Sequence, residues 1–186
     1  MNLDNINDKL KEMLPPKRFN HSLNVAKCAY DLSEIYNFNK EDAYIAGIMH
    51  DCAKYLNKNE VKYYVEKYNI YLDCLEENNL ALSHSIIGSY IAKYELNIKN
   101  EDIINAIKYH TTGKENMDIL EKIIYMADLI EEERNFPGVE LLRELTYSGK
   151  LDEALLCSFN NTIKFVIDNN QLIHLRTIEA RNYLIK

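Results

Sequence analysis

The sequence predicts an all-α protein folded as one helical bundle. Among its 186 residues, glycine and proline occur five and three times, and strand-like alternation bounded by turns is hard to find. Long stretches instead carry apolar residues at the spacing of an amphipathic helix. A chain of this length can bury one sizeable core, and no repeat, low-complexity tract or linker divides it. We therefore expect one compact domain over residues 1–186.

Ten helices are expected, and most are bounded by residues that start or stop a helix. Pro15-Pro16 ends the first, because proline breaks the ladder of helical hydrogen bonds. Asn37 breaks the second, and Glu41 suits the positive N-terminal end of the third. The fourth is polar enough to lie exposed. The expected ranges are 3–13, 17–37, 40–52, 57–68, 83–94, 101–110, 117–134, 139–147, 151–169 and 176–185.

In the second half of the chain, an irregular link precedes the fifth helix, which Ser83 is expected to cap. Gly113 is expected to stop the sixth helix. The seventh carries a nearly continuous apolar run and ends before the turn at Pro137-Gly138. The last three helices, within 139–186, are expected to pack on the rest of the bundle.

Composition limits the classes of function. The formal net charge is -7, from 22 Lys and Arg against 29 Asp and Glu, which argues against non-specific nucleic-acid binding but leaves a small phosphate substrate open. No signal peptide and no apolar stretch of roughly 20 residues is present, so we expect a cytoplasmic protein without a membrane partner. The cysteines lack CxxC spacing and are expected to be reduced, mostly buried thiols rather than zinc ligands.

A set of imidazoles and carboxylates stands out against this background. His50-Asp51 closes an apolar helix pattern, and Asp128 lies inside another, where an unpaired carboxylate is costly to bury. Taken singly, a histidine near a helix end is more often a cap or a satisfied core group, and Asp128 could pair with a cation. Taken jointly, the residues favour a site for Fe, Mn, Zn or Co. The candidate metal ligands are His21, His50, Asp51, His84, His110 and Asp128.

The order of these residues resembles the HD superfamily of metal-dependent phosphohydrolases, and His84 and His110 are similar to the added ligands of members that hold two metals. Local strings resemble the bacterial YqeK-like family of symmetrical diadenosine tetraphosphate hydrolases. These strings are Arg18-Phe-Asn-His-Ser-Leu, His50-Asp-Cys-Ala-Lys54, His84-Ser-Ile-Ile-Gly88, His110-Thr-Thr-Gly113, Arg134-Asn-Phe-Pro-Gly138 and the tail Thr177-Ile-Glu-Ala-Arg181.

The resemblance implies an all-α HD domain whose metal site is built from 18–134, and cleavage of diadenosine tetraphosphate (Ap4A) into two ADP. It implies a two-metal centre, with iron favoured and manganese, cobalt or zinc left open by the donor set. Asp51, with two oxygens, is expected to bridge the metals. His21, His50 and Asp128 would complete one ion, and His84 with His110 the other.

Contacts to the polyphosphate are expected from side chains near these ligands. Arg18 lies one turn before His21, and Lys54 lies three residues after Asp51, where it could neutralise charge on the leaving group. Arg134 could hold a phosphate bidentately, or be a surface residue beside its acidic neighbours. Thr111 could contact substrate or cap a helix, and His174 could contact adenosine or pack the tail.

Two positions depart from the family pattern, which usually has proline where Leu175 and Glu132 stand. Two other interpretations are kept. One is a different HD phosphohydrolase, acting on nucleoside monophosphates or cyclic nucleotides. The other is a non-catalytic nucleotide-binding or partner-binding helical module with a structural metal. A homodimer is possible for a helical domain of this size.

Overall fold

The structure, a computed structural model, describes residues 3–186, and within this range it consists of eleven α-helices without a β-strand. The predicted all-α class is confirmed. The helices are α1 (Leu3–Met13), α2 (Pro16–Ile35), α3 (Lys40–Met49), α4 (Lys58–Tyr68), α5 (Cys74–Asn78), α6 (Leu80–Tyr94), α7 (Glu101–Tyr109), α8 (Ile119–Ile130), α9 (Val139–Tyr147), α10 (Leu151–Asp168) and α11 (Leu175–Tyr183).

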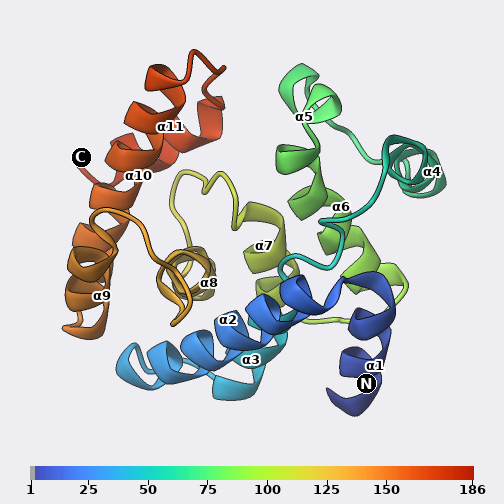
Figure 1. The fold of residues 1–186 in the computed structure, drawn as a ribbon, viewed down its shortest axis with the longest axis horizontal. Coiled ribbons are helices and arrows are strands. Elements are labelled where there is room, and N and C mark those ends of the chain that lie inside the picture. The colour runs from blue at the N-terminus through green and yellow to red at the C-terminus, as the bar shows by residue number, and fades with distance from the viewer. Residues whose placement is uncertain (1–2) are drawn as a thin grey trace.

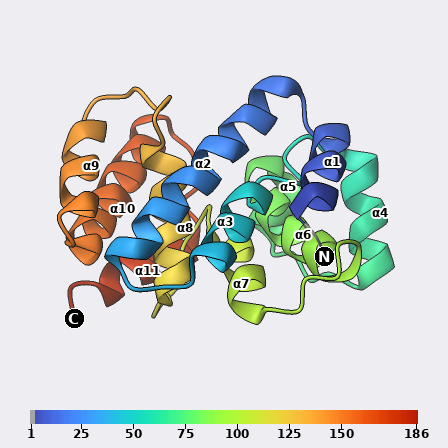
Figure 2. The same ribbon diagram turned by 90° about the horizontal axis from the view of Figure 1, so that it is seen from below.

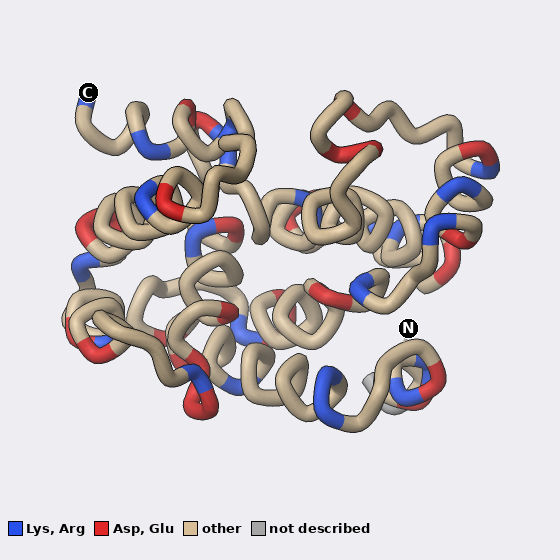
Figure 3. Tube along the Cα trace, turned by 45° about the horizontal axis from the view of Figure 1, so that its top comes forward, with Lys and Arg blue, Asp and Glu red and all other residues tan. Residues whose placement is uncertain are grey.

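Helix α8 lies at the centre of the bundle (Figure 1). It packs against α2, α3 and α7, and also against α9 and α10. Viewed from below, α2 runs across the molecule and joins the part formed by α9–α11 to the part formed by α4–α7 (Figure 2). Lys and Arg are interspersed with Asp and Glu along the trace (Figure 3). Among the described residues, no helix is long and apolar enough to cross a membrane.

Small residues allow α2 and α3 to cross closely. Ala26, Ala29, Ala43 and Ala46 are fully buried at this part of the core. A Cβ atom on Gly47 would lie 2.7 Å from Ala26 Cα, so only glycine fits without a backbone shift. This crossing places the middle of α2 against the C-terminal half of α3.

The third helix ends sooner than predicted. It stops at Met49, so His50 and Asp51 lie in the turn that follows rather than in the helix. Shorter-range bonds take over there: Cys52 N–H donates to Met49 O at 3.0 Å, and Lys54 N–H to Asp51 O at 2.9 Å. These tight turns point neighbouring side chains in directions that a continuing helix would not.

The predictions for the middle of the chain were wrong in two details. Helix α6 begins at Leu80, where the Asn79 side chain accepts from Ala81 N, so Ser83 is a buried residue inside the helix and not its cap. The link before it contains a short helix, α5, which the sequence interpretation missed. Asp73 and Glu76 form a reciprocal capping box at its start.

Other boundaries moved by a few residues. Asp118 and Glu121 form a capping box at the start of α8, and Glu131 leaves the helical conformation with ψ 160°. The helix therefore covers less than 117–134. Cys28 and Cys52 are buried as expected, whereas Cys74 is exposed and Cys157 is partly buried.

Candidate metal centre

The six predicted ligands meet in the interior of the bundle. His21 comes from α2, His84 from α6 and Asp128 from α8, while the others follow the ends of α3 and α7. The five residues other than Asp128 are buried, and the Asp128 side chain is 20% exposed. Three sets of ligand atoms lie within 4.8 Å of one another: His21, His50 and Asp51; Asp51, His84 and His110; and His50, His110 and Asp128.

Asp51 lies between two groups of imidazoles. Its Oδ1 is 2.9 Å from His84 Nε2 and 3.5 Å from His110 Nε2. Its Oδ2 is 3.3 Å from His50 Nε2. On the far side of His50, Asp128 Oδ1 lies 2.9 Å from His21 Nε2 and 3.7 Å from His50 Nε2. The carboxylate of Asp51 therefore faces both halves of the cluster.

The four imidazoles are held in the same tautomer. Nδ1–H of His50 donates to Gly47 O at 2.7 Å, and that of His110 to Ile107 O at 2.8 Å. The corresponding groups of His84 and His21 donate to Leu80 O at 3.3 Å and to the Glu131 carboxylate at 3.2 Å. Because carbonyl and carboxylate oxygens can only accept, Nδ1 carries a proton in each ring, and in the neutral imidazole Nε2 then presents its lone pair to the centre.

This arrangement fits a divalent cation. Among the described residues, His21 Nε2, His50 Nε2 and Asp51 Oδ1 are buried without a hydrogen bond, although other ligand atoms lie close. His84 Nε2 and His110 Nε2 are 3.2 Å apart, so two lone pairs face each other. Converging acceptors of this kind need a cation to compensate them, and nitrogen with oxygen donors suits Fe, Mn, Co or Zn.

The protonation of the ligands also suits a metal. Burial opposes ionisation of Asp51, but the imidazoles, His50 first, hold its pKa well below the usual range. Burial likewise opposes ionisation of Asp128, and the neighbouring His21 and His50 lower its pKa. Burial lowers the pKa of His84 to about 4, so this imidazole is neutral at pH 7 and can donate its lone pair.

Three predicted cationic residues lie against the ligands. Arg18 Nη1 is 2.8 Å from Asp51 Oδ2, and Arg134 Nη2 is 2.5 Å from Asp128 Oδ1. Lys54 Nζ is 3.6 Å from Asp51 Oδ1 and 3.2 Å from His84 Nε2. Lys54 reaches these atoms from the turn that follows α3, because the helix itself ends at Met49. Thr111 joins the same group, with Oγ1 3.2 Å from His110 Nε2.

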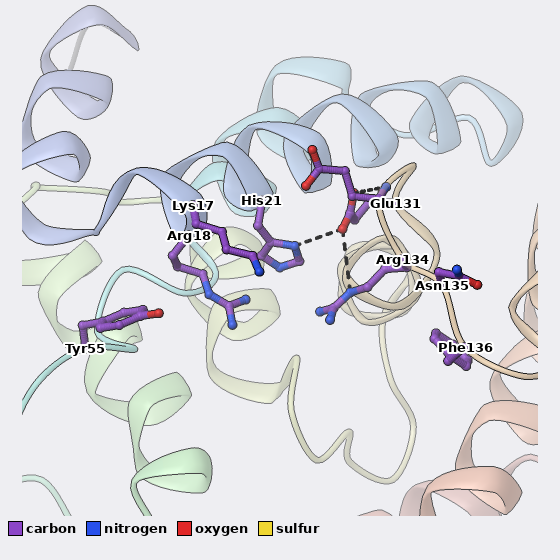
Figure 4. A pocket seen from close by; sticks show the side chains of 9 residues that line it. Lys17, Arg18, His21, Tyr55, Glu131, Arg134, Asn135 and Phe136 are labelled. Atoms are coloured by element: carbon purple, nitrogen blue, oxygen red, sulfur yellow. Dashed lines mark hydrogen bonds and ion pairs between the residues drawn. The ribbon is translucent and has the colours of Figure 1, made fainter.

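A cleft of about 580 Å³ opens beside the cluster. Figure 4 shows Arg18, His21 and Arg134 in its middle, with Tyr55 at one end and Phe136 at the other. Lys17 and Glu133 also line it. One edge of the metal cluster is therefore reachable from solvent.

Glu131 is a site residue that the sequence interpretation did not single out. Its side chain is 2% exposed; Oε1 accepts from His21 Nδ1, and Oε2 accepts from Glu133 N at 2.8 Å. The carboxylate therefore orients the His21 ring. The available signal was its position three residues after Asp128 within the expected helix 117–134, although Glu131 lies just past the end of α8.

His174 lies outside the metal cluster. It caps α11, and its Nδ1 accepts from Arg176 N at 3.2 Å, so the proton is on Nε2. Nε2 is 3.1 Å from Asp73 Oδ2 and 3.3 Å from Glu76 Oε1. This tautomer lacks a lone pair directed at the two carboxylates, in contrast to the four ligand histidines. A contact between His174 and substrate stays a prediction.

Comparisons with known proteins agree with this geometry. The HD domain model matches residues 18–133. The symmetrical bis(5'-nucleosyl)-tetraphosphatase of Staphylococcus aureus is 36% identical, over 98% of this chain and 94% of that protein. The protein of the same name from Halalkalibacterium halodurans is 38% identical, over 95% of this chain and 93% of its own length. The crystal structure of a predicted HD superfamily hydrolase involved in NAD metabolism, from Clostridium acetobutylicum, is 46% identical with a TM-score of 0.95, over 100% of this chain and 97% of that one.

Proposed function

Since the chain belongs to the HD domain family and, within it, to the symmetrical bis(5'-nucleosyl)-tetraphosphatases, we propose that it hydrolyses Ap4A symmetrically into two ADP. The observation that carries this proposal is the cluster of four imidazoles and two carboxylates whose lone pairs converge beside an open cleft. Such a donor set is that of a metal-dependent phosphohydrolase.

The proposed ligand assignment follows the two faces of Asp51. His21, His50 and Asp128 would hold one ion, His84 and His110 the other, and Asp51 would contact both. When bound, two divalent ions supply Lewis-acid polarisation of a phosphate and activation of water. We favour iron, while the nitrogen and oxygen donors also suit manganese, cobalt and zinc.

Cations of the chain would bind and orient the polyphosphate. Lys54 lies beside Asp51 and His84, where its ammonium group can donate to a phosphate oxygen and stabilise charge on the departing ADP. Arg18 and Arg134 flank the cleft and can share their guanidinium donors between a ligand carboxylate and a phosphate. Thr111 would donate its hydroxyl near His110.

Product analysis tests the proposal. Protein purified without oxygen, and analysed for its metal, is incubated with Ap4A, and the nucleotides are separated by chromatography. ADP is expected as the sole nucleotide product. Asp51→Ala removes a ligand from both proposed metal positions, so its rate of hydrolysis is expected to fall by about 100-fold or more. ATP together with AMP would contradict symmetrical cleavage. A single-domain chain, cytoplasmic localisation and a homodimer remain predictions.

A further inference from the structure

Two aromatic side chains face the cleft from opposite ends. Figure 4 places Tyr55 at one end and Phe136 at the other, with Arg18 and Arg134 between them. The Tyr55 side chain is 57% exposed, although its ring borders a cleft. Within the described residues, its ring has no aromatic or cationic partner, unlike the stacked tyrosines of α4 and α6.

The backbone holds Tyr55 close to the metal ligands. It directly follows Lys54, whose Nζ contacts both Asp51 and His84. The turn that carries it is closed by Lys54 N–H donating to Asp51 O at 2.9 Å and by Leu56 N–H donating to Ala53 O at 3.2 Å. These bonds fix the backbone of Tyr55 relative to the cluster, while its ring remains open to solvent.

Phe136 is fixed in a comparable way at the other end. Arg143 ties the segment before it to the core, donating to Ile130 O at 3.0 Å and to Glu131 O and Arg134 O, both at 2.8 Å. Pro137 restricts the backbone of Phe136. The ring is partly buried against the core, with its remaining surface on the cleft.

The space between the rings is suited to phosphates. Arg18 and Arg134 lie there, and Lys17 is an exposed cation that makes no ion pair with the described residues. Two carboxylates also line the cleft: Glu131, which accepts from His21 and from Glu133 N–H and lies 3.8 Å from Arg134 Nε, and Glu133, which is exposed at the rim. The three cations outnumber these two carboxylates, so the lining forms a cationic strip beside the ligand cluster although the protein is acidic.

We propose that Tyr55 and Phe136 are specificity-determining residues, each stacking one nucleobase of a dinucleoside polyphosphate whose phosphates follow the cationic strip. This inference rests on the proposed function and adds how the two ends of the substrate are recognised. Stacking uses the π-face that every base has, so the site is expected to accept guanine as well as adenine at either end. The separation of the two rings selects for the length of the polyphosphate chain between the two bases.

Leucine substitutions test the two rings. Tyr55→Leu and Phe136→Leu keep apolar volume while removing the aromatic face. Each is expected to raise KM for Ap4A about 10-fold with a smaller change in kcat, and the double variant about 100-fold, following the usual size of base–aromatic stacking. Inhibition by inorganic tetraphosphate, which has no base, is expected to keep its wild-type constant in all three. Tyr55→Phe is expected to restore the wild-type KM.

Tyr71→Leu is the matched control, because Tyr71 is 83% exposed and does not line the cleft. Its KM is expected to equal that of the wild type. A wild-type KM in both single leucine variants would overturn the assignment of the rings and leave Ap4A hydrolysis intact. A parallel loss of tetraphosphate inhibition would also overturn it, since the damage would then lie in the phosphate site. Failure of the wild-type protein to form ADP would instead contradict the proposed function itself.

Discussion

Four histidines share one arrangement although they come from different helices. Each donates through Nδ1, to three backbone carbonyls and one carboxylate, so that Nε2 faces the cluster. The sequence indicates which residue types are present, but the tautomer depends on acceptors that the fold brings into range. His174 shows the difference, because its Nδ1 accepts from a backbone N–H and its other nitrogen must carry the proton.

His84 makes the stability of the metal-free protein depend on pH. Its pKa is about 4 in the folded protein against an ordinary value of 6.5, because of burial. Between these values the unfolded chain binds more protons, so lowering the pH through this window destabilises the fold. We expect this residue to contribute a loss of about 2 kcal/mol in the free energy of unfolding between pH 7 and pH 5.

Urea titrations with a chelator present, at pH 7 and pH 5, measure this loss. His84→Gln has no group that titrates in the window and can still accept from Lys54 Nζ. The variant is therefore expected to lose less stability than the wild type on acidification. Equal losses in the two proteins would show that His84 is not held neutral by its surroundings.

At the scale of the elements, periodicity predicted ten of the eleven helices, and the errors were at their ends. The third helix stops before His50 because the chain turns there through short-range bonds, which apolar spacing does not report. Helix α5 is a single short turn with a local signal, the pair Asp73 and Glu76, rather than a periodic one. Capping chemistry therefore carries information that hydrophobic periodicity lacks.

Gly47→Ala tests the close crossing of α2 and α3. Gly47→Ala adds a Cβ that would meet Ala26 Cα at 2.7 Å and Ala26 N at 3.0 Å, so the two backbones must separate. We expect the free energy of unfolding to fall by about 2–3 kcal/mol in denaturant titrations. Because α2 carries His21 and α3 leads into His50, metal content after purification is expected to fall as well.

Gly88→Ala is the matched control for this crossing. It is also a helical glycine, but an added Cβ would meet a side-chain atom, Cys52 Sγ, at 3.2 Å. A side chain can adjust more easily than a backbone, and alanine favours the helix by about 1 kcal/mol. The control is expected to be clearly less destabilised. Similar losses of unfolding free energy in the two variants would mean that the α2–α3 contact tolerates an added Cβ no less well than the surroundings of Gly88.

At the scale of the whole molecule, the metal cluster is a product of the tertiary fold. The residue types of the ligands and their order could be predicted from the sequence. The distances between α2, α6 and α8, in contrast, follow from packing around α8. The spacing after Asp128 could have drawn attention to Glu131, but its contact with His21 could not be predicted for the same reason, since the two residues are 110 positions apart. Arg18 and Arg134 were predicted near the site, and the structure shows that each contacts a ligand carboxylate.

The two proposed metal ions together take ligands from five parts of the chain and should stabilise the whole fold, because the unfolded chain cannot assemble the site. With free metal at about 100 times its Kd, the gain is about 2.7 kcal/mol, and chelation is expected to lower Tm by about 5–10 °C for a chain of this size. Scanning calorimetry with and without EDTA measures this shift.

Asp128→Asn removes a ligand charge at nearly constant volume and is expected to abolish most of the Tm shift. Asp73→Asn, at the separate group around His174, keeps a good helix cap and is expected to retain the full shift. If Asp73→Asn lost the Tm shift and Asp128→Asn kept it, the stabilising metal would lie at the group of Asp73, Glu76 and His174. The assignment of the metal to the four histidines with Nε2 facing inward would then be wrong.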